Sequence, residues 1–288
     1  MRTEAVEKFD LEAVRAWIGR EERASDIVSV DLVRKFNATL DLSDRAPAVG
    51  DIAPLLINYC LAQPAALTNT LGEDGHPKKG GFLPPIPLPR RMWAGSTVTF
   101  HQAPRVGDMV QRVSRISDIV LKEGRSGVLC FVTVTHRFEV GGKLVTEEIQ
   151  DIVYREADTG KGVSNPAPSA SAPRGTHTRR LSVTAPLLFR YSALTFNGHR
   201  IHYDRRYATE IEHYPGLVVH GPLQATALLN LATELKGTAP LQFSFRGQSP
   251  LFDDDRIYLH AEEEAGKVKL WSARENGPIA MSAEAIWS

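Results

Sequence analysis

The stretch Val218-Val-His-Gly-Pro-Leu-Gln-Ala-Thr-Ala-Leu-Leu-Asn-Leu-Ala-Thr-Glu-Leu235 decides the fold of this sequence. An apolar run ends in Gly221-Pro222, and proline suits the first turn of a helix because its fixed φ is already helical. From there Leu223, Ala227, Leu228 and Leu235 recur with a period close to 3.6 residues. We therefore predict a long helix over Pro222 to Leu235 whose apolar stripe lies in the core.

Two strand pairs are expected, one in each half of the chain. Their turns and flanking strands are Val128 to Thr135, Gly141-Gly142 and Leu144 to Tyr154 in the first half, and Val268 to Ala273, Asn276-Gly277 and Ile279 to Trp287 in the second. Gly-Gly and Asn-Gly readily supply the positive φ angles that tight hairpin turns require. Antiparallel hairpins are therefore predicted in both halves.

The two halves also repeat one another. Pro104 and Asp108 recur as Pro250 and Asp254, 146 residues later. Each half carries a short helical pattern and then a longer apolar one. These are Leu32, Val33 and Phe36 followed by Ile52 to Leu61, and Leu187, Leu188 and Tyr191 followed by Pro222 to Leu235. The repeated order predicts an α+β protein of two similar units, each an antiparallel sheet wrapped round a long helix.

Residues 156–178 separate the two units. Small residues and proline dominate this stretch, and Val163 is its one large apolar residue. Such a segment cannot bury enough apolar surface to offset the entropy of ordering it, so it is predicted to be a linker. We expect an N-terminal unit over residues 1–155 and a C-terminal unit over residues 179–288.

Charge and composition exclude several classes of protein. Lys and Arg together number 34, and so do Asp and Glu, so the chain lacks the positive field of a nucleic-acid binder. No run approaches the roughly 18 apolar residues of a membrane span, and the polar N-terminus is unlike a signal peptide. Cys60 and Cys130 alone provide neither a disulfide framework nor a cysteine-based zinc site. We expect a cytoplasmic protein without a cofactor.

Titratable chemistry concentrates in one segment of the second half. Four of the nine histidines, His199, His202, His213 and His220, fall within 22 residues. Histidine is the default proton-transfer group near neutral pH. Next to it, the free N–H groups at the predicted helix start, at Gly221, suit a carbonyl oxygen that becomes negative. This combination favours chemistry at the carbon alpha or beta to a carbonyl.

Two segments resemble the hydratase/dehydratase branch of the MaoC-like hotdog superfamily. Its usual signature is Ser/Thr-Gly-Asp-x-Asn-Pro-x-His, and a His-Gly element opens the hotdog helix. In Thr195-Phe-Asn-Gly-His-Arg-Ile-His202, the first and last residues match, and Asn197 stands in place of the aspartate. Together with Gly216-Leu-Val-Val-His-Gly-Pro222, the segment is more similar to the type-2 hydroxyacyl-thioester dehydratases and to itaconyl-CoA and mesaconyl-C4-CoA hydratases. The resemblance implies a double hotdog and an acyl-CoA thioester as substrate.

The resemblance also implies roles for individual residues. His202 would be the general acid/base, and the Gly221 N–H would bind the thioester carbonyl as it becomes an enolate. Asn197 can orient water but cannot exchange a proton as a carboxylate does. The proton-transfer work then falls on His202, assisted by Asp204 or His199.

Four further residues have two alternative roles each, one functional and one structural. His220 either contacts the substrate or braces the turn. Arg90-Arg91, after the proline-rich run Pro84 to Pro89, either forms a lid that binds CoA phosphates or a carboxylate, or is a solvated loop edge. Arg246 either meets a phosphate or is exposed on a strand. A metal at His199 and His202 is disfavoured because no third ligand has a recognisable spacing, so we expect none.

We expect an enoyl-CoA hydratase that adds water to a short branched C5-dicarboxylic thioester, itaconyl-CoA or mesaconyl-C4-CoA, giving citramalyl-CoA. The alternatives are a 3-hydroxyacyl-thioester dehydratase of fatty-acid type and a non-catalytic acyl-CoA-binding protein. The N-terminal unit has no His-x-x-His, so we expect it to supply binding surface only. The sequence is compatible with a homo-oligomer of the whole chain.

Overall fold

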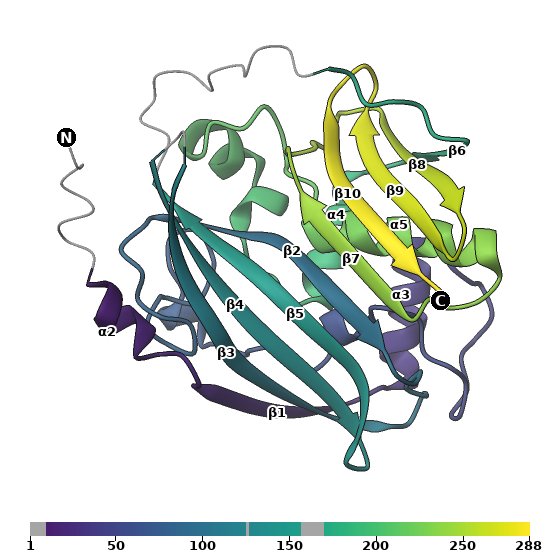
Figure 1. The fold of residues 1–288 in the computed structure, drawn as a ribbon, viewed down its shortest axis with the longest axis horizontal. Coiled ribbons are helices and arrows are strands. Elements are labelled where there is room, and N and C mark those ends of the chain that lie inside the picture. The colour runs from purple at the N-terminus through teal and green to yellow at the C-terminus, as the bar shows by residue number, and fades with distance from the viewer. Residues whose placement is uncertain (1–9, 125–126, 157–169) are drawn as a thin grey trace.

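The computed structural model describes residues 10–124, 127–156 and 170–288, and its centre is one ten-stranded antiparallel sheet (Figure 1). The strands lie in the order β1-β3-β4-β5-β2-β7-β10-β9-β8-β6. Those of the first half are β1 (Glu21–Ile27), β2 (Arg90–Phe100), β3 (Met109–Gly124), β4 (Gly127–Val140) and β5 (Lys143–Arg155). Those of the second half are β6 (His177–Leu181), β7 (Gln242–Gly247), β8 (Ile257–Glu264), β9 (Lys267–Arg274) and β10 (Ile279–Ile286).

The helices are short except for one. The α-helices are α2 (Leu11–Arg15), α3 (Val30–Leu40), α4 (Ala185–Leu194) and α5 (Gly221–Lys236). The 3-10 helices are η1 (Ile57–Cys60), η2 (Thr68–Thr70) and η3 (Arg200–His202), and η4 (Tyr207–Ile211) is a π-helix. None of the described helices is long and apolar enough to cross a membrane.

Strands β2 and β7 join the two half-sheets. They pair antiparallel, with Gly95 opposite Arg246 and Thr99 opposite Gln242. The backbones approach so closely at Gly95 that a Cβ there would lie 2.3 Å from the carbonyl oxygen of Phe245. A glycine is therefore required at this point of the seam.

The predicted long helix of the second half is confirmed as α5. Pro222 stands in its first turn, and Gly237 ends it with a φ of +71°. This left-handed conformation costs glycine little, so glycine commonly follows the last helical turn. Leu223 and Leu228 are fully buried, and the helix packs across β7 to β10 (Figure 1). The short helical patterns are confirmed too, as α3 and α4, which contact each other.

The long helix expected over Ile52 to Leu61 in the first half is wrong. Ile52 instead forms an isolated β-bridge with Arg105, and only η1 is helical in this stretch. Leu56 and Ala62 adopt positive φ angles of +61° and +52°. A left-handed residue interrupts the helical hydrogen-bond pattern, so the apolar side chains are buried by a tight turn instead. Within its described residues, 10–124 and 127–156, the first unit therefore has no long helix across its sheet.

Both predicted hairpins are confirmed. Gly141 and Gly142 have φ angles of +55° and +75° between β4 and β5, and Asn276 has a φ of +56° between β9 and β10. Of the predicted linker, residues 157–169 lie outside the described residues. His177 and Thr178 belong to strand β6, so the regular structure of the second half begins before residue 179.

The proline-rich run Pro84 to Pro89 is neither a free lid nor a solvated edge. Ile86 and Leu88 are buried in the core cluster under β3 and β4. The ammonium group of Lys79 donates to the carbonyl oxygens of both residues. The segment is therefore held against the first unit at alternate positions.

Gly95→Ala is expected to destabilise the joined sheet by about 1–3 kcal/mol, because the new methyl group forces β2 away from β7. Gly247→Ala is the matched control at the same seam, since its Cβ would lie 3.7 Å from the nearest atom, an ordinary contact. Thermal unfolding of the two variants checks this. Equal midpoints for both would contradict the close approach at Gly95.

Candidate active site

A cavity of about 1660 Å³ opens between the two units. The first unit lines it with the loop Leu71 to Lys79 and with side chains of β4 and β5. The second unit lines it with the histidine segment and with the start of α5. Since both units contribute, the cavity exists only in the joined chain.

His202 lies in this cavity with one ring nitrogen committed. Its Nδ1 is 2.7 Å from the carbonyl oxygen of Val218, so Nδ1 carries the hydrogen and donates it. Nε2 is consequently an acceptor. Burial lowers the pKa of His202 to about 4, against an opposing effect of the Val218 hydrogen bond. The ring is therefore neutral at pH 7 and can take a proton, as a general base must.

His220 stacks on His202. The two ring centroids are 3.7 Å apart, and the planes are inclined by 19°. Nε2 of His220 is 2.8 Å from the Ser192 hydroxyl, whereas its buried Nδ1 has no hydrogen-bond partner within the described part of the chain. Burial first, and then the neighbouring histidines, hold the pKa of His220 well below its usual value. Two neutral imidazoles thus stand face to face at the helix start.

Helix α5 begins at Gly221, directly after His220. The His220 side chain makes no capping hydrogen bond to the first turn, and Pro222 has no N–H group. A Cβ on Gly221 would meet only Met281 Cε, at 3.8 Å, so nothing else crowds the backbone there. The N–H groups of this first turn lack intrahelical partners, and the helix dipole favours negative charge beside them.

Asn197 lies on the cavity wall with its oxygen engaged. Oδ1 accepts a hydrogen bond of 3.0 Å from the backbone N–H of His199. The group left for a ligand is therefore the amide NH₂, a donor that cannot remove a proton. The place of the signature aspartate is filled by a residue that orients but does not titrate.

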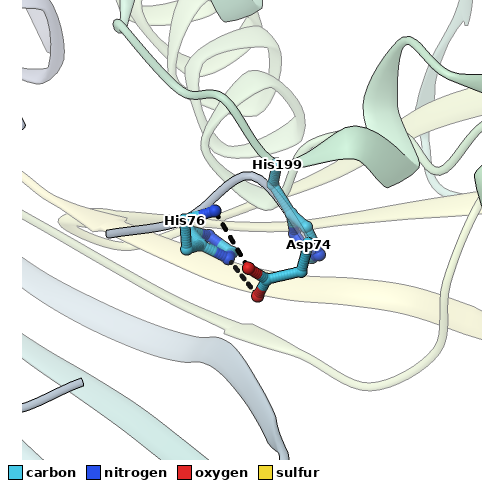
Figure 2. Close-up of side chains that lie close together, drawn as sticks. All are labelled: Asp74, His76 and His199. Carbon is cyan, nitrogen blue, oxygen red and sulfur yellow. Dashed lines mark hydrogen bonds and ion pairs between the residues drawn. The ribbon is translucent and has the colours of Figure 1, made fainter. Parts of the chain in front are cut away.

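Sequence reasoning missed Asp74 and His76, which the fold brings from the first unit to His199 (Figure 2). The carboxylate of Asp74 accepts hydrogen bonds from the backbone N–H and from Nδ1 of His76, at 3.0 and 2.9 Å. The His76 and His199 ring centroids are 4.1 Å apart, and those of His199 and His202 are 5.4 Å apart. One ligand atom from each of Asp74, His76 and His199 lies within 4.8 Å of the other two, so these three residues could hold a metal ion.

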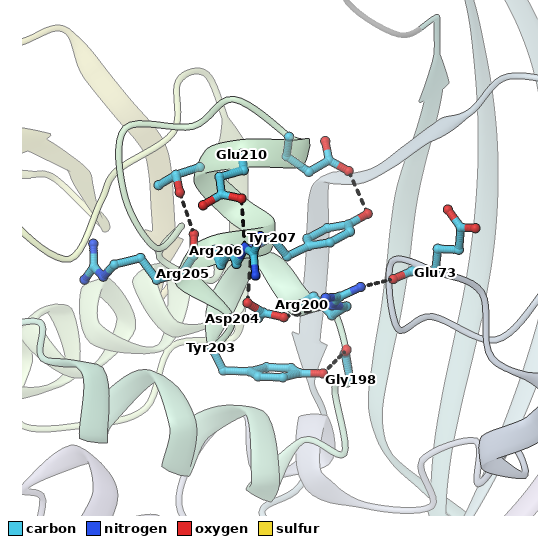
Figure 3. A network of polar contacts seen from close by, with 11 residues as sticks. Glu73, Gly198, Arg200, Tyr203, Asp204, Arg205, Arg206, Tyr207 and Glu210 are labelled. Carbon is cyan, nitrogen blue, oxygen red and sulfur yellow. Dashed lines mark hydrogen bonds and ion pairs between the residues drawn. The ribbon is translucent and has the colours of Figure 1, made fainter.

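Asp204, an expected catalytic assistant, is placed elsewhere. Its carboxylate binds Arg200 at 2.8 and 3.0 Å and accepts the backbone N–H of Tyr207 at 3.1 Å (Figure 3). The Tyr207 N–H and the Arg200 guanidinium lower the pKa of this carboxyl. Asp204 does not line the cavity. Its role is to brace the turn after His202, because its oxygens are already engaged there.

The three expected binding arginines differ in their surroundings. Arg90 pairs with Glu212 at 3.3 Å, and its guanidinium lies over the Tyr214 ring. Arg91 is half-buried in the cavity wall, and its charge adds to burial, the main cause, in lowering the pKa values of His76 and His199. Arg246 is exposed on β7 at the cavity. Arg91 and Arg246 are thus the two that a ligand can reach most directly.

A second group missed from sequence is Glu148, on the first unit's wall of the cavity. Its carboxyl is buried and lies 3.4 Å from the Tyr59 hydroxyl. Burial raises its pKa from 4.5 to about 7, although hydrogen bonds from Ser96 and Tyr59 oppose the shift. The sequence pattern around it, Thr146-Glu-Glu-Ile149, shows two adjacent glutamates and gives no sign of which one faces inward.

The chain is similar in sequence to known hydratases and dehydratases. The family model for hydroxyacyl-thioester dehydratase type 2 matches residues 57–253, and the chain belongs to this family of hydro-lyases. It is 44% identical over 269 residues to the mesaconyl-C(4)-CoA hydratase of Chloroflexus aurantiacus, covering 93% of this chain and 95% of that protein. It is 28% identical over 231 residues to the mitochondrial hydroxyacyl-thioester dehydratase type 2 of Schizosaccharomyces pombe, covering 71% and 75%.

Solved structures share the fold at low sequence identity. HtdX of Mycobacterium tuberculosis superposes with a TM-score of 0.67 at 18% identity, covering 92% of this chain and all of that one. A second protein of that organism, described as having a double hotdog fold, gives a TM-score of 0.52 at 15% identity and covers 93% and 96%. The fold of this chain is accordingly a double hotdog, and the described part of its first unit has no long helix.

Glu148→Gln is expected to change how stability depends on pH. The folded pKa of Glu148 lies above the unfolded one, so the wild type loses stability as pH rises from about 4.5 to about 7. The glutamine variant lacks this loss. Its stability relative to wild type should rise by up to roughly 3 kcal/mol between pH 4.5 and pH 8. Thermal midpoints of both proteins across this range check it, and a constant difference would show that the Glu148 carboxyl is not perturbed.

Proposed function

We propose that this enzyme adds water across the double bond of a short C5-dicarboxylic enoyl-CoA of the mesaconyl-C4-CoA type. The observation that carries the proposal is the neutral His202, whose Nε2 acceptor lies in the cavity beside the start of α5. A base and an oxyanion site in one cavity are what hydration of an enoyl thioester requires.

In the proposed reaction, Nε2 of His202 takes a proton from water as the water oxygen bonds to the β carbon. The electrons of the double bond move onto the thioester carbonyl, whose oxygen becomes negative. The N–H of Gly221 binds that oxygen, and His220, held at Nε2 by the Ser192 hydroxyl, keeps the His202 ring in place by stacking on it. His202 then returns the proton to the α carbon. Asn197 orients the water through its amide NH₂.

The binding roles follow from the surroundings of the arginines. Arg91, half-buried in the wall, is proposed to bind the free carboxylate of the acyl group, because a guanidinium pairs with it through two hydrogen bonds. Arg246, exposed at the cavity, is proposed to meet the phosphates of CoA. Arg90 contributes indirectly, by fixing Glu212. In this scheme residues 1–155 form the substrate-binding unit, and residues 179–288 form the unit with the catalytic motif.

Two observations support a short polar acyl group. The relative that is 44% identical carries the name of a C5-dicarboxylyl-CoA hydratase. The first unit also turns polar side chains into the cavity, namely Arg112, Ser114, His136, Glu148 and Gln150. These groups have hydrogen-bond or ion-pair partners within the protein, but a long hydrocarbon chain along this wall would still remove water from their polar atoms, which is costly.

The second candidate is a 3-hydroxyacyl-thioester dehydratase with a longer acyl chain. The name of the matching family favours it, and so does the cavity volume, which exceeds what a C5 acyl group fills. The chemistry would be the same reaction run in reverse.

We further propose that the enzyme lies in the cytoplasm. The edge strands β1 and β6 of the sheet are where it would associate with a second copy.

A substrate panel distinguishes the two. Hydration rates with mesaconyl-C4-CoA, itaconyl-CoA, crotonyl-CoA and a long-chain enoyl-CoA are compared by following the loss of enoyl-thioester absorbance. We expect the highest kcat/KM for a C5-dicarboxylic thioester, because Arg91 has a carboxylate to bind. Faster turnover of crotonyl-CoA or the long chain would overturn the substrate assignment.

His202→Ala is expected to lower kcat by about 10²-fold or more, the usual contribution of a positioned acid/base group. Thioester binding, measured by calorimetry with the product CoA ester, should persist, because the arginines and Gly221 remain. His177→Ala is the control, since His177 pairs with Glu263 outside the cavity. A wild-type chain that binds these esters but hydrates none would instead identify a non-catalytic acyl-CoA-binding protein.

A further inference from the structure

The loop that carries Asp74 and His76 is fixed to the histidine segment of the second unit by backbone contacts. A Cβ on Gly75 would lie 1.9 Å from the carbonyl oxygen of Gly198, and one on Gly198 would lie 2.7 Å from that of Gly75. The Arg200 backbone N–H donates to the Asp74 carbonyl at 2.9 Å, and its guanidinium donates to the Glu73 carbonyl at 3.0 Å. Two glycines let the backbones touch, so this loop has a defined place in the site.

Within that loop, Asp74 fixes the state of the His76 ring. Because Nδ1 donates to the carboxylate, Nε2 is left as an acceptor (Figure 2). The same Asp–His arrangement holds an imidazole in one tautomer and stabilises positive charge on it in hydrolytic triads. Both side chains line the cavity. The pair is therefore oriented for use and open to a ligand.

The described part of the second unit has no carboxylate beside His202, and the Asp74–His76 pair brings one near. Asn197 offers only a donor group, and the partner of His202 Nδ1 is an uncharged backbone carbonyl. Neither supplies the negative charge that a developing imidazolium needs. Asp74 supplies such a charge at one end of the row of rings His76, His199 and His202. Burial raises the pKa of Asp74, but its hydrogen bond with His76 outweighs this and keeps the carboxyl well below its usual range.

We propose that His76 is a further catalytic residue of the hydration and that Asp74 is its positioning residue, so that the first unit replaces the carboxylate missing at Asn197. This inference rests on the proposed function. His76 Nε2 accepts one hydrogen of the attacking water while His202 Nε2 removes the other. The proton taken by His202 returns to the α carbon, so each turnover adds one water and leaves both rings neutral.

A metal at Asp74, His76 and His199 is the competing use of the same atoms. Both oxygens of Asp74 already accept hydrogen bonds from His76. This geometry suits a carboxylate that orients a histidine more than one that binds an ion. Loss of activity on dialysis against EDTA, recovered on adding Zn²⁺, would overturn the proposal in favour of a metal site.

The test uses the full chain with the best substrate of the panel. His76→Gln and Asp74→Asn are each expected to lower kcat by about 10²-fold while KM changes little. In Asp74→Asn the acidic limb of the kcat/KM profile should also move to lower pH. Burial lowers the pKa of His76, the Asp74 carboxylate opposes this shift, and removing the carboxylate lets that pKa fall further. A structural role would not move this limb.

A rescue experiment separates the proposal from simple damage to the fold. Asp74→Asn combined with Asn197→Asp returns a carboxylate to the site, at the position of the family signature, and should regain about tenfold in kcat. Asp51→Asn is the matched control: Asp51 likewise accepts hydrogen bonds from a nearby backbone N–H and from a side chain, that of Arg45, but lies outside the cavity. Its kcat should equal that of wild type.

These experiments distinguish the proposed hydratase function from the proposed role of His76. If His202→Ala abolishes hydration and Asp74→Asn and His76→Gln do not, the proposed function stands and this inference is wrong. If Asp74→Asn loses activity but the double variant regains none, with an unchanged pH limb and a folded protein, the pair is structural and the inference is again wrong. A wild type that hydrates no member of the panel overturns both.

Discussion

The pairing of β2 with β7 is the constraint on which the rest of the molecule depends. It turns two half-sheets into one continuous sheet, and its register fixes how each unit faces the other. Because the seam is held by backbone hydrogen bonds and by the close approach at Gly95, the two units cannot slide without breaking several contacts together. The cavity lies where they meet. The geometry of the site is therefore a property of the joined sheet.

The second unit could be predicted well from sequence because its signals are local. Helix α5 has proline at its start, glycine after its end and an apolar stripe between them. Its hairpin has Asn-Gly at the turn, and the first unit's hairpin, which was also predicted correctly, has the equally local signal Gly-Gly. The stretch from Ile52 to Leu61 failed because its apolar residues fit a helix and a buried turn equally well. What decides between them is the left-handed backbone at Leu56, and no local signal marks a leucine for that conformation.

The site divides in the same way. Asn197, His202 and Gly221 lie in two neighbouring segments, Thr195 to His202 and Gly216 to Pro222, so the sequence predicts that they share a site. Asp74 and His76 reach His199 only through the fold, from another unit, and nothing in the spacing of the chain predicts that meeting. Asp204 looked reactive beside His202, but its partners within three or four residues engage it fully. Residues that are close in the sequence could be predicted to share a site. Which of them are available for chemistry depends on burial and on hydrogen bonds, which only the fold determines.

The missing helix of the first unit breaks the symmetry of the molecule. Two identical subunits would each change whenever one did, so a helix lost from one would be lost from both. Covalent linkage of the two copies in one gene removes that restriction. One unit can then line the cavity without a long helix, while the other keeps α5. A chain that links two such units can hold them in different forms, which two identical subunits cannot do.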